Sequence, residues 1–159
     1  MIATGIGYDV HRLVADRPLI LGGVEIPHSL GLDGHSDADV LCHAIADAVL
    51  GAAGEPDIGH LFPNTDPTIR GISSLEILRR VRSVLEEKSI QLHNIDATLI
   101  AEEPRIAPHL SEMKYRVGAA LGLSPARVGI KATTNESMGF LGRGEGMAAL
   151  ATACVNLPE

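Results

Sequence analysis

The chain has 159 residues, the usual size of one domain, and 45% of them are hydrophobic, which excludes a disordered chain. The formal net charge is −7 and Lys and Arg form no run, so we expect no nucleic-acid partner. No segment approaches the roughly 20 apolar residues of a membrane span, and residues 1–10 lack the basic and apolar regions of a signal peptide, so we expect a cytoplasmic protein with no membrane partner.

The chain opens with extended segments. Residues 2–13 alternate in polarity and predict a strand. Asp9 and His11 then share one face of that strand, because side chains repeat every second residue. Residues 18–21 and 24–26 are also extended, and the glycine pair between them predicts a bend or bulge.

The clearest helix is predicted over residues 36–53. Ser36 is the expected N-cap, and a glycine and a proline just beyond the helix end it. His43 lies on a polar stripe with Asp39 and Asp47, one helical turn to either side. The opposite stripe is apolar and predicts a face that packs into the core.

The rest of the chain continues to mix helices and strands within a single predicted domain, residues 1–159. An α/β fold follows, in the form of an α+β sandwich whose mixed β-sheet has helices on one face. The remaining predicted elements are helices over 73–88 and 106–121 and strands over 92–101, 128–133 and 146–155.

A first candidate site combines Asp9 and His11 of the first strand with His43 of the helix. One carboxylate and two imidazoles suit tetrahedral zinc, and three protein ligands leave a fourth position for a substrate. Either Asp39 or Asp47 could accept a hydrogen bond from the His43 nitrogen that faces away from the metal and so fix the orientation of the ring. Because Asp-x-His is a short pattern, the alternative is that these are surface strand residues and a histidine satisfied within the fold.

Three further segments have the composition of binding loops. The backbone around His35 and Ser36 stands at the expected start of a helix, where unpaired N–H groups favour an anion. Residues 62–67 place polar side chains between two prolines, which predicts an ordered loop. In residues 131–146 a strand runs into hydroxyl groups and a glycine-dense turn that can hold phosphate oxygens, while Glu136 can hold a divalent cation. Each segment is also consistent with a structural role: helix capping, a connecting loop, or a turn between strands.

Six short strings form a pattern when they are read together along nearly the whole chain. They are GYDVH (7–11), GHSDAD (34–39), DIG (57–59), FPNTD (62–66), KATT (131–134) and GFLGRGEG (139–146). In this order they resemble the 2-C-methyl-D-erythritol 2,4-cyclodiphosphate synthase family of the non-mevalonate (MEP) isoprenoid pathway. Each string is weak by itself, but six in register are highly specific.

The resemblance implies a phosphorus–oxygen lyase. Its substrate would be 4-diphosphocytidyl-2-C-methyl-D-erythritol 2-phosphate, converted to the cyclic 2,4-diphosphate and CMP by metal-assisted intramolecular phosphoryl transfer. The family pattern implies Zn2+ or another divalent ion on the ligand set Asp9, His11 and His43. It also implies Mg2+ or Mn2+ on Glu136, bridging the substrate phosphates, and a catalytic role for His35 and Thr134 in stabilising the transition state.

The resemblance further implies a homotrimer that assembles around its sheet faces, with active sites between neighbouring subunits. Phe140 and Arg143 match residues that line a cavity on the trimer axis, where an isoprenoid diphosphate can bind. Residues 101–107 match the loop that holds the cytosine ring. The expected substrate-binding residues are Ser36, Asp57, Ile58, Gly59, Phe62, Pro63, Asn64, Thr65, Asp66, Ala101, Pro104, Arg105, Ile106, Ala107, Thr133, Asn135, Phe140 and Arg143.

The sequence departs from the family pattern at a few positions that bear on specificity. Asn64 stands where an Asp is common, Asn135 replaces a Thr, and Glu102-Glu103 adds charge beside the nucleotide loop. None of these is an expected metal ligand. Two other functions also fit some of the residues: a zinc-dependent phosphoester hydrolase, and a non-catalytic trimer that binds a nucleotide or an isoprenoid diphosphate.

Overall fold

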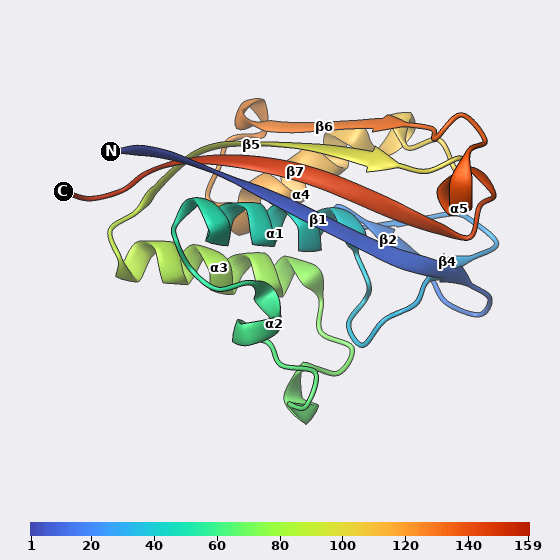
Figure 1. Ribbon diagram of the computed structural model, residues 1–159, viewed down its shortest axis with the longest axis horizontal. Coiled ribbons are helices and arrows are strands. Elements are labelled where there is room, and N and C mark those ends of the chain that lie inside the picture. Colours follow the sequence, from blue (N-terminus) through green and yellow to red (C-terminus); the bar gives the residue numbers. More distant parts are fainter.

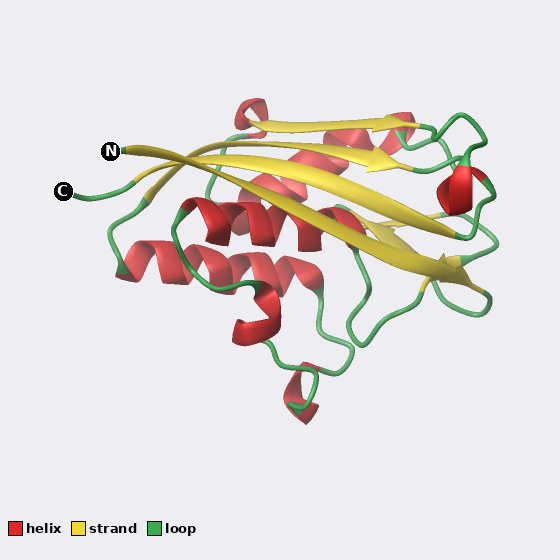
Figure 2. Cartoon of the chain, in the orientation of Figure 1, coloured by secondary structure: helices red, strands yellow, loops and turns green.

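A curved five-stranded sheet with helices against one face forms the framework of the protein, as Figures 1 and 2 show for the computed structural model of residues 1–159. Strands β5 and β6 are parallel and the other neighbouring strands are antiparallel, so the sheet is mixed, as expected. The strand order is β4 (Gly31–Leu32), β1 (Ile2–Val14), β7 (Gly146–Asn156), β5 (Gln91–Ile100) and β6 (Val128–Thr133).

A separate two-stranded hairpin consists of β2 (Leu19–Leu21) and β3 (Val24–Ile26). The two residues of its turn, Gly22 and Gly23, have φ values of 58° and 76°. Two successive positive φ values suit the tight turn of a two-residue hairpin and are unfavourable for residues with a side chain. The predicted bend is therefore confirmed as a hairpin turn.

Three long helices cover the inner face of the sheet, where Figure 1 shows α1 and α3 beneath the strands and α4 on the more distant side. The central helix α1 is buried along almost its whole length. Aliphatic side chains from the helices and the sheet form one continuous core. The long helices are α1 (Val40–Ala52), α3 (Ser74–Glu87) and α4 (Leu110–Leu121), and the short ones are α2 (Ile58–Leu61) and α5 (Gly139–Gly142). Three 3-10 turns, at Pro67–Ile69, Ala107–His109 and Pro125–Arg127, complete the set.

The predicted starting residue of the first helix was wrong. Helix α1 begins at Val40 with Asp39 as its N-cap, and not with Ser36. Ala38 has a φ of 56°, which interrupts any helix that starts before it. The Ser36 hydroxyl accepts a hydrogen bond from the Ala38 N–H instead, so this segment forms a turn that precedes the helix.

The outer face of the sheet is not covered by the helices. Alternate side chains of β1 point to this face, and Ile6 is 71% exposed. Tyr8 and Val10 on β1 and Leu150 on β7 are also exposed large hydrophobic residues. An apolar stripe of this kind is typical of a surface that another molecule or another subunit covers.

None of the helices combines the length and the apolar character needed to cross a membrane.

Candidate active site

Strand β1 and helix α1 bring the first candidate site together by close backbone packing. A Cβ placed on Gly7 would lie only 1.9 Å from the carbonyl oxygen of Ala44. Glycine therefore allows the helix to lie directly on the strand, two residues before Asp9. His43 stands next to Ala44 on the helix and so reaches the face of β1 that carries Asp9 and His11.

The three predicted metal ligands converge. Asp9 Oδ2 lies 2.8 Å from His11 Nε2 and 3.1 Å from His43 Nδ1, and the two ring nitrogens lie 3.3 Å apart. Four ligands at zinc–ligand distances of about 2.0–2.1 Å in a tetrahedron are separated by roughly 3.3 Å from one another. The observed separations thus fit a single small cation that is bound by all three side chains.

The protons around His11 support the same conclusion. Its Nδ1 lies 2.6 Å from the carbonyl oxygen of Asp33, which can only accept a hydrogen bond, so Nδ1 carries the proton. In the neutral ring, Nε2 then presents a lone pair to Asp9 and His43. Burial raises the pKa of Asp9, but when no cation is bound and the two rings are protonated, hydrogen bonds from His11 and His43 outweigh burial and lower that pKa to about 2, so the carboxylate stays ionised. A carboxylate and an imidazole lone pair that face each other favour a cation between them.

A cavity of about 200 Å³ opens beside this cluster. Its walls include the loop before α1, the short helix α2 and the start of the proline-bracketed loop, so it brings several predicted substrate residues to the metal ligands. Besides the cluster it is lined by Gly34, His35, Ser36, Ile58, Gly59, Phe62, Asn64, Ile69, Ile72 and Ile77. Thr65 and Asp66 line an adjoining cavity that also contains His35 and Asn64.

Arg17 fixes the loop that carries His35 and Ser36. Its guanidinium donates to the carbonyl oxygens of Gly34, at 2.8 Å, and of Ser36, at 2.9 Å. These two carbonyl groups flank His35, so Arg17 sets the path of the backbone at the cavity wall. The sequence did not reveal this role, because an arginine that binds backbone carbonyls leaves no residue pattern at its partners.

The expectation that Asp39 or Asp47 would support His43 was wrong. Asp39 is fully buried, caps α1, and accepts the backbone N–H groups of the β2–β3 turn. Asp47 accepts a hydrogen bond from the Ile58 N–H at 2.9 Å, which holds the start of α2. The outward nitrogen of His43, Nε2, instead contacts the hydroxyl groups of Ser36 and Ser74.

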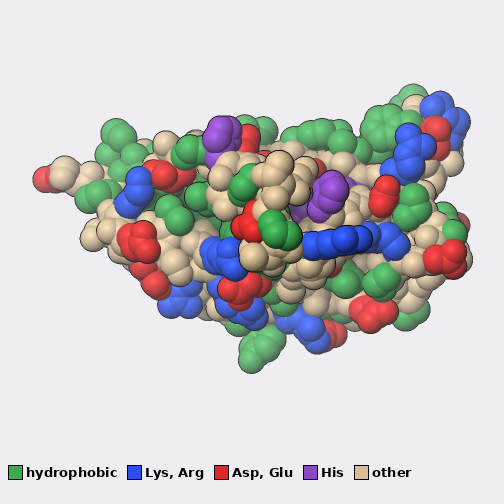
Figure 3. Space-filling model, turned by 90° about the horizontal axis from the view of Figure 1, so that it is seen from below, with side chains coloured by type: hydrophobic (Ala, Val, Ile, Leu, Met, Phe, Trp, Pro, Cys, Tyr) green, Lys and Arg blue, Asp and Glu red, His purple; other side chains and the backbone are tan.

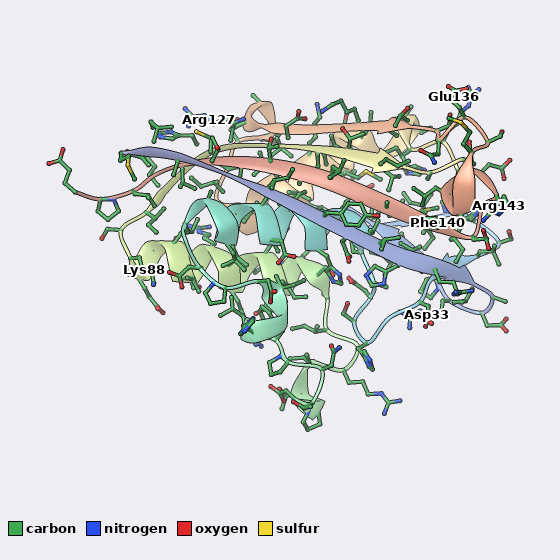
Figure 4. All side chains as sticks on the ribbon, in the orientation of Figure 1. Asp33, Lys88, Arg127, Glu136, Phe140 and Arg143 are labelled. Atoms are coloured by element: carbon green, nitrogen blue, oxygen red, sulfur yellow. The ribbon has the colours of Figure 1, made fainter.

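Part of the predicted site lies away from the three candidate metal ligands within one chain. Glu136, like Thr134, follows β6, which is three strands from β1 in the sheet. At about 4.8 Å for each strand, this separation is roughly 14 Å. Figure 4 shows Glu136, Phe140 and Arg143 at the end of the molecule where α5 lies. Within one chain, neither Thr134 nor Glu136 lines the cavity beside the metal ligands.

The loop after β5 is also outside that cavity. Ala101 and Ile106 are buried and anchor the loop, while Pro104, Arg105 and Ala107 are partly or fully exposed. Glu102 accepts the backbone N–H of Ser137 at 2.9 Å, so the loop is tied to the turn that follows β6. The predicted cytosine-binding loop and the predicted phosphate-binding turn therefore form one continuous surface at the carboxyl ends of β5 and β6.

The surface charges are mixed on the face shown in Figure 3, where acidic and basic side chains alternate over the helices and loops. Several basic side chains are paired, such as Arg82 with Glu86 at 2.7 Å. Arg143 is likewise paired with Glu145, at 2.9 Å. On this face an anionic ligand would therefore meet single positive side chains and not an extended basic surface.

We expect the affinity of the cluster for a divalent cation to fall as the pH drops through the raised pKa of His11. Burial lowers the pKa of His11. The hydrogen bond to Asp9, the charge of Asp9 and the hydrogen bond to the Asp33 carbonyl raise this pKa by more than burial lowers it, so it lies above the usual 6.5. As the pH falls through this raised pKa, His11 gains the proton that must leave before a metal binds, whereas Asp9 stays ionised. Competition titrations with a chelator across neutral pH measure the effect. A pH-independent affinity, or a decline that begins only below 6.5, would contradict it.

Comparison with known proteins places this site in a family. The model of the YgbB family matches residues 2–156. The chain is 62% identical over 161 residues to the 2-C-methyl-D-erythritol 2,4-cyclodiphosphate synthase of Akkermansia muciniphila, with 100% of this chain and 95% of the relative covered.

Solved structures share the fold over the whole chain. The bifunctional IspDF of Campylobacter jejuni matches with a TM-score of 0.94 and 41% identity, over 100% of this chain and 43% of that one. A complex of Plasmodium falciparum IspF with CDP matches with a TM-score of 0.86 and 29% identity, over 99% and 97% of the two chains. The family model matches residues 2–156, and the three candidate metal ligands lie together beside a cavity. The chain belongs to the YgbB family.

Proposed function

We propose that this chain converts 4-diphosphocytidyl-2-C-methyl-D-erythritol 2-phosphate to 2-C-methyl-D-erythritol 2,4-cyclodiphosphate and CMP. The convergence of Asp9, His11 and His43 on one point beside a cavity carries the proposal. The names of the curated relatives support it, since they are 2-C-methyl-D-erythritol 2,4-cyclodiphosphate synthases at 53–62% identity. The enzyme is thus a phosphorus–oxygen lyase of isoprenoid biosynthesis.

The three side chains would hold a divalent cation, for which zinc is our assignment because the donor set is one carboxylate and two imidazoles. When bound, this cation supplies Lewis-acid neutralisation of the substrate diphosphate. His35 and Ser36 then face the same phosphates from the loop that Arg17 holds. Ser36 donates its hydroxyl proton to a phosphate oxygen, and His35 stabilises the charge of the transition state.

The reaction needs no strong base. The attacking group is an oxygen of the 2-phosphate, which is largely ionised at neutral pH because its second pKa is about 6. This oxygen forms a bond to the β-phosphorus, the bond from that phosphorus to the bridging oxygen of CMP breaks, and CMP leaves with the electron pair. Holding the two phosphates in line accounts for up to about 7–11 kcal/mol of the barrier.

The walls of the cavity bind the erythritol part of the substrate. Asp57 caps α2 and stands at its exposed start, while Ile58 and Gly59 line the cavity next to the metal ligands. Phe62 is buried, and the Arg80 guanidinium lies 5.2 Å from the centre of its ring. This contact holds the beginning of the segment that continues through Pro63, Asn64, Thr65 and Asp66.

The active site is completed by a second subunit of a homotrimer. One chain leaves Thr134, Glu136 and the loop 101–107 three strands away from its own metal ligands. The apolar stripe of β1 and β7 supplies a surface that a neighbouring subunit can cover. In the trimer, Thr134 contributes to the transition state and the loop 101–107 holds the cytosine. Thr133 and Asn135 flank the phosphates.

The second metal and the axial cavity belong to the same assembly. Glu136 is exposed and would hold a Mg2+ or Mn2+ ion, which would supply positive charge to the substrate phosphates. Phe140 is 45% exposed and shares a surface cavity with Val10 of β1. With Arg143 it lines the cavity on the trimer axis that takes an isoprenoid diphosphate.

The proposed reaction is tested by incubating the protein with the cytidylated substrate and a divalent ion and following the products by phosphorus NMR. CMP and a single cyclic diphosphate are expected in equal amounts. A linear diol phosphate or free phosphate would show hydrolysis, and binding of CMP without turnover would show a non-catalytic protein. Either result contradicts the proposed reaction.

A further inference from the structure

His43 has two ring nitrogens, and the one that faces away from the metal ligands contacts two serine hydroxyls. Its Nε2 lies 3.0 Å from Ser74 Oγ and 3.1 Å from Ser36 Oγ. Ser74 is the first residue of α3 and is fully buried, so it has no access to water. Nothing in the proposed reaction uses Ser74, and its role has to follow from its own hydrogen bonds.

The Ser74 hydroxyl donates its proton to Asp37. Ser74 Oγ also contacts Asp37 Oδ1, and an ionised carboxylate has no proton to donate. The single hydroxyl proton of Ser74 is therefore donated to Asp37. In its contact with His43, Ser74 Oγ can only accept, so the proton of the neutral His43 ring lies on Nε2 and the lone pair lies on Nδ1, toward Asp9 and His11.

Asp37 is itself held in place by backbone groups. Its Oδ1 accepts the N–H of Asp39 at 3.2 Å, and its Oδ2 accepts the N–H of Ser74 at 2.8 Å. The carboxylate thus joins the turn before α1 to the start of α3. Because two fixed N–H groups orient the carboxylate, the hydrogen bond from Ser74 to Asp37 has a fixed direction.

Ser36 is the less constrained of the two partners. Its Oγ accepts the Ala38 N–H at 3.1 Å, and its hydroxyl proton has no committed acceptor within the chain. Ser36 also lines the cavity beside the metal ligands, whereas Ser74 does not. With Ser74 as the constant acceptor for His43, the Ser36 hydroxyl is free to turn toward a phosphate.

We propose that Ser74 and Asp37 are positioning residues: the chain of hydrogen bonds from His43 through Ser74 to Asp37 fixes the proton of His43 on Nε2 and presents Nδ1 to the metal. This inference rests on the proposed metal site. Outer partners of a metal-binding histidine fix its tautomer and ring orientation, and their loss typically weakens metal binding by about 10- to 100-fold.

The test is the zinc dissociation constant of the Ser74→Ala variant, measured by competition with a coloured chelator. Alanine removes the hydroxyl and keeps the backbone N–H that binds Asp37. Zinc binding is expected to weaken by about 10- to 100-fold. Ser83→Ala is the matched control on the same helix, because the Ser83 hydroxyl is exposed and donates only to the carbonyl of Arg79. It should bind zinc within about twofold of the parent protein, as a change away from the metal site does.

A second variant and a spectroscopic measurement separate positioning from a purely structural effect. Asp37→Asn keeps the shape but replaces a carboxylate oxygen by a donor, so it also weakens zinc binding. In the metal-free parent protein, at a pH where His43 is neutral, nitrogen NMR of the imidazole rings is expected to place the His43 proton already on Nε2. This measurement needs no variant and still decides the proposal if Ser74→Ala fails to fold.

The possible failures are distinguishable. If the parent protein binds no zinc, both the metal site and the positioning role are overturned. If the parent binds zinc and Ser74→Ala binds it equally tightly, the positioning role alone is overturned and the metal site stands. A neutral His43 whose proton lies on Nδ1 in the metal-free protein also overturns the positioning role. Cobalt substitution gives a further readout, since a misoriented His43 changes the visible absorption of the bound ion.

Discussion

The His43→Ala variant is expected to lose tight zinc binding and about a thousandfold in turnover. His43 is one of the three side chains that can hold a cation in the cluster, and its removal would leave only Asp9 and His11 to bind it. A bound metal contributes several kcal/mol to the stabilisation of a phosphoryl transition state. Because each 1.4 kcal/mol corresponds to a tenfold change in rate, a loss of about 4 kcal/mol gives the stated factor. Zinc content after gel filtration and the initial rate of CMP release measure the two effects.

His93→Ala is the matched control for this experiment. His93 lies near the start of β5, at the far end of the sheet from the cluster, and its Nε2 is buried without a hydrogen-bond partner. Removing this imidazole should leave zinc content and turnover unchanged. The metal-free His43→Ala protein should retain cooperative unfolding. CMP release by His43→Ala at the rate of the parent protein would contradict a metal role for His43.

The Gly7→Ala variant is expected to be destabilised by about 3 kcal/mol, the upper part of the range for overpacked sites. Its new Cβ would meet the carbonyl oxygen of Ala44 at 1.9 Å and the backbone nitrogen of Ala48 at 2.7 Å. These are backbone atoms of a buried helix, so they cannot move aside alone, and α1 must shift away from β1. In a domain of this size the destabilisation corresponds to a fall of roughly 6–12 °C in the melting temperature.

The same shift should weaken zinc binding, because α1 carries His43 and β1 carries Asp9 and His11. Gly51→Ala is the matched control on α1, since a Cβ there meets only the carbonyl oxygen of Ile6, at 3.9 Å. Alanine is favoured over glycine in a helix by up to about 1 kcal/mol, so Gly51→Ala should equal or exceed the stability of the parent. Denaturant unfolding of the metal-free proteins measures the difference. Equal stability of Gly7→Ala and Gly51→Ala would show that strand and helix are not packed as described.

The local patterns of the sequence predicted the parts of the fold that local physics decides. The alternation of residues 2–13 placed Asp9 and His11 on one face of a strand, and β1 confirms it. The strand and helix types over the other predicted segments are also confirmed, apart from small differences at their ends. Hydrophobic periodicity is sufficient for these elements, because each of them buries one face.

The start of α1 was missed because two residues compete for the cap. Both Ser36 and Asp39 are good N-cap types, and the sequence alone does not show that Ala38 takes a positive φ. The hairpin glycines resolve the competition, since Gly22 and Gly23 donate their N–H groups to Asp39 and bury it at the start of the helix. This is a contact between distant segments, and it leaves no local signal.

The support of His43 was missed for a similar reason. Asp39 and Asp47 are its neighbours at helical spacing, yet the partner that receives its proton comes from α3. Spacing along one helix predicts which side chains share a face, but it carries no information about a second helix that packs against that face. The predicted roles of Thr134 and Glu136 would need a neighbouring subunit beside the metal ligands, so these roles stay predictions.

The most direct test of the site is a crystal structure of the zinc-loaded protein with an anomalous map at the zinc edge. The geometry predicts one peak within about 2.0–2.2 Å of Asp9 Oδ2, His11 Nε2 and His43 Nδ1. The fourth position of this ion should face the cavity next to Ser36. An ion bound elsewhere, or one that lacks any of these three ligands, would contradict the account.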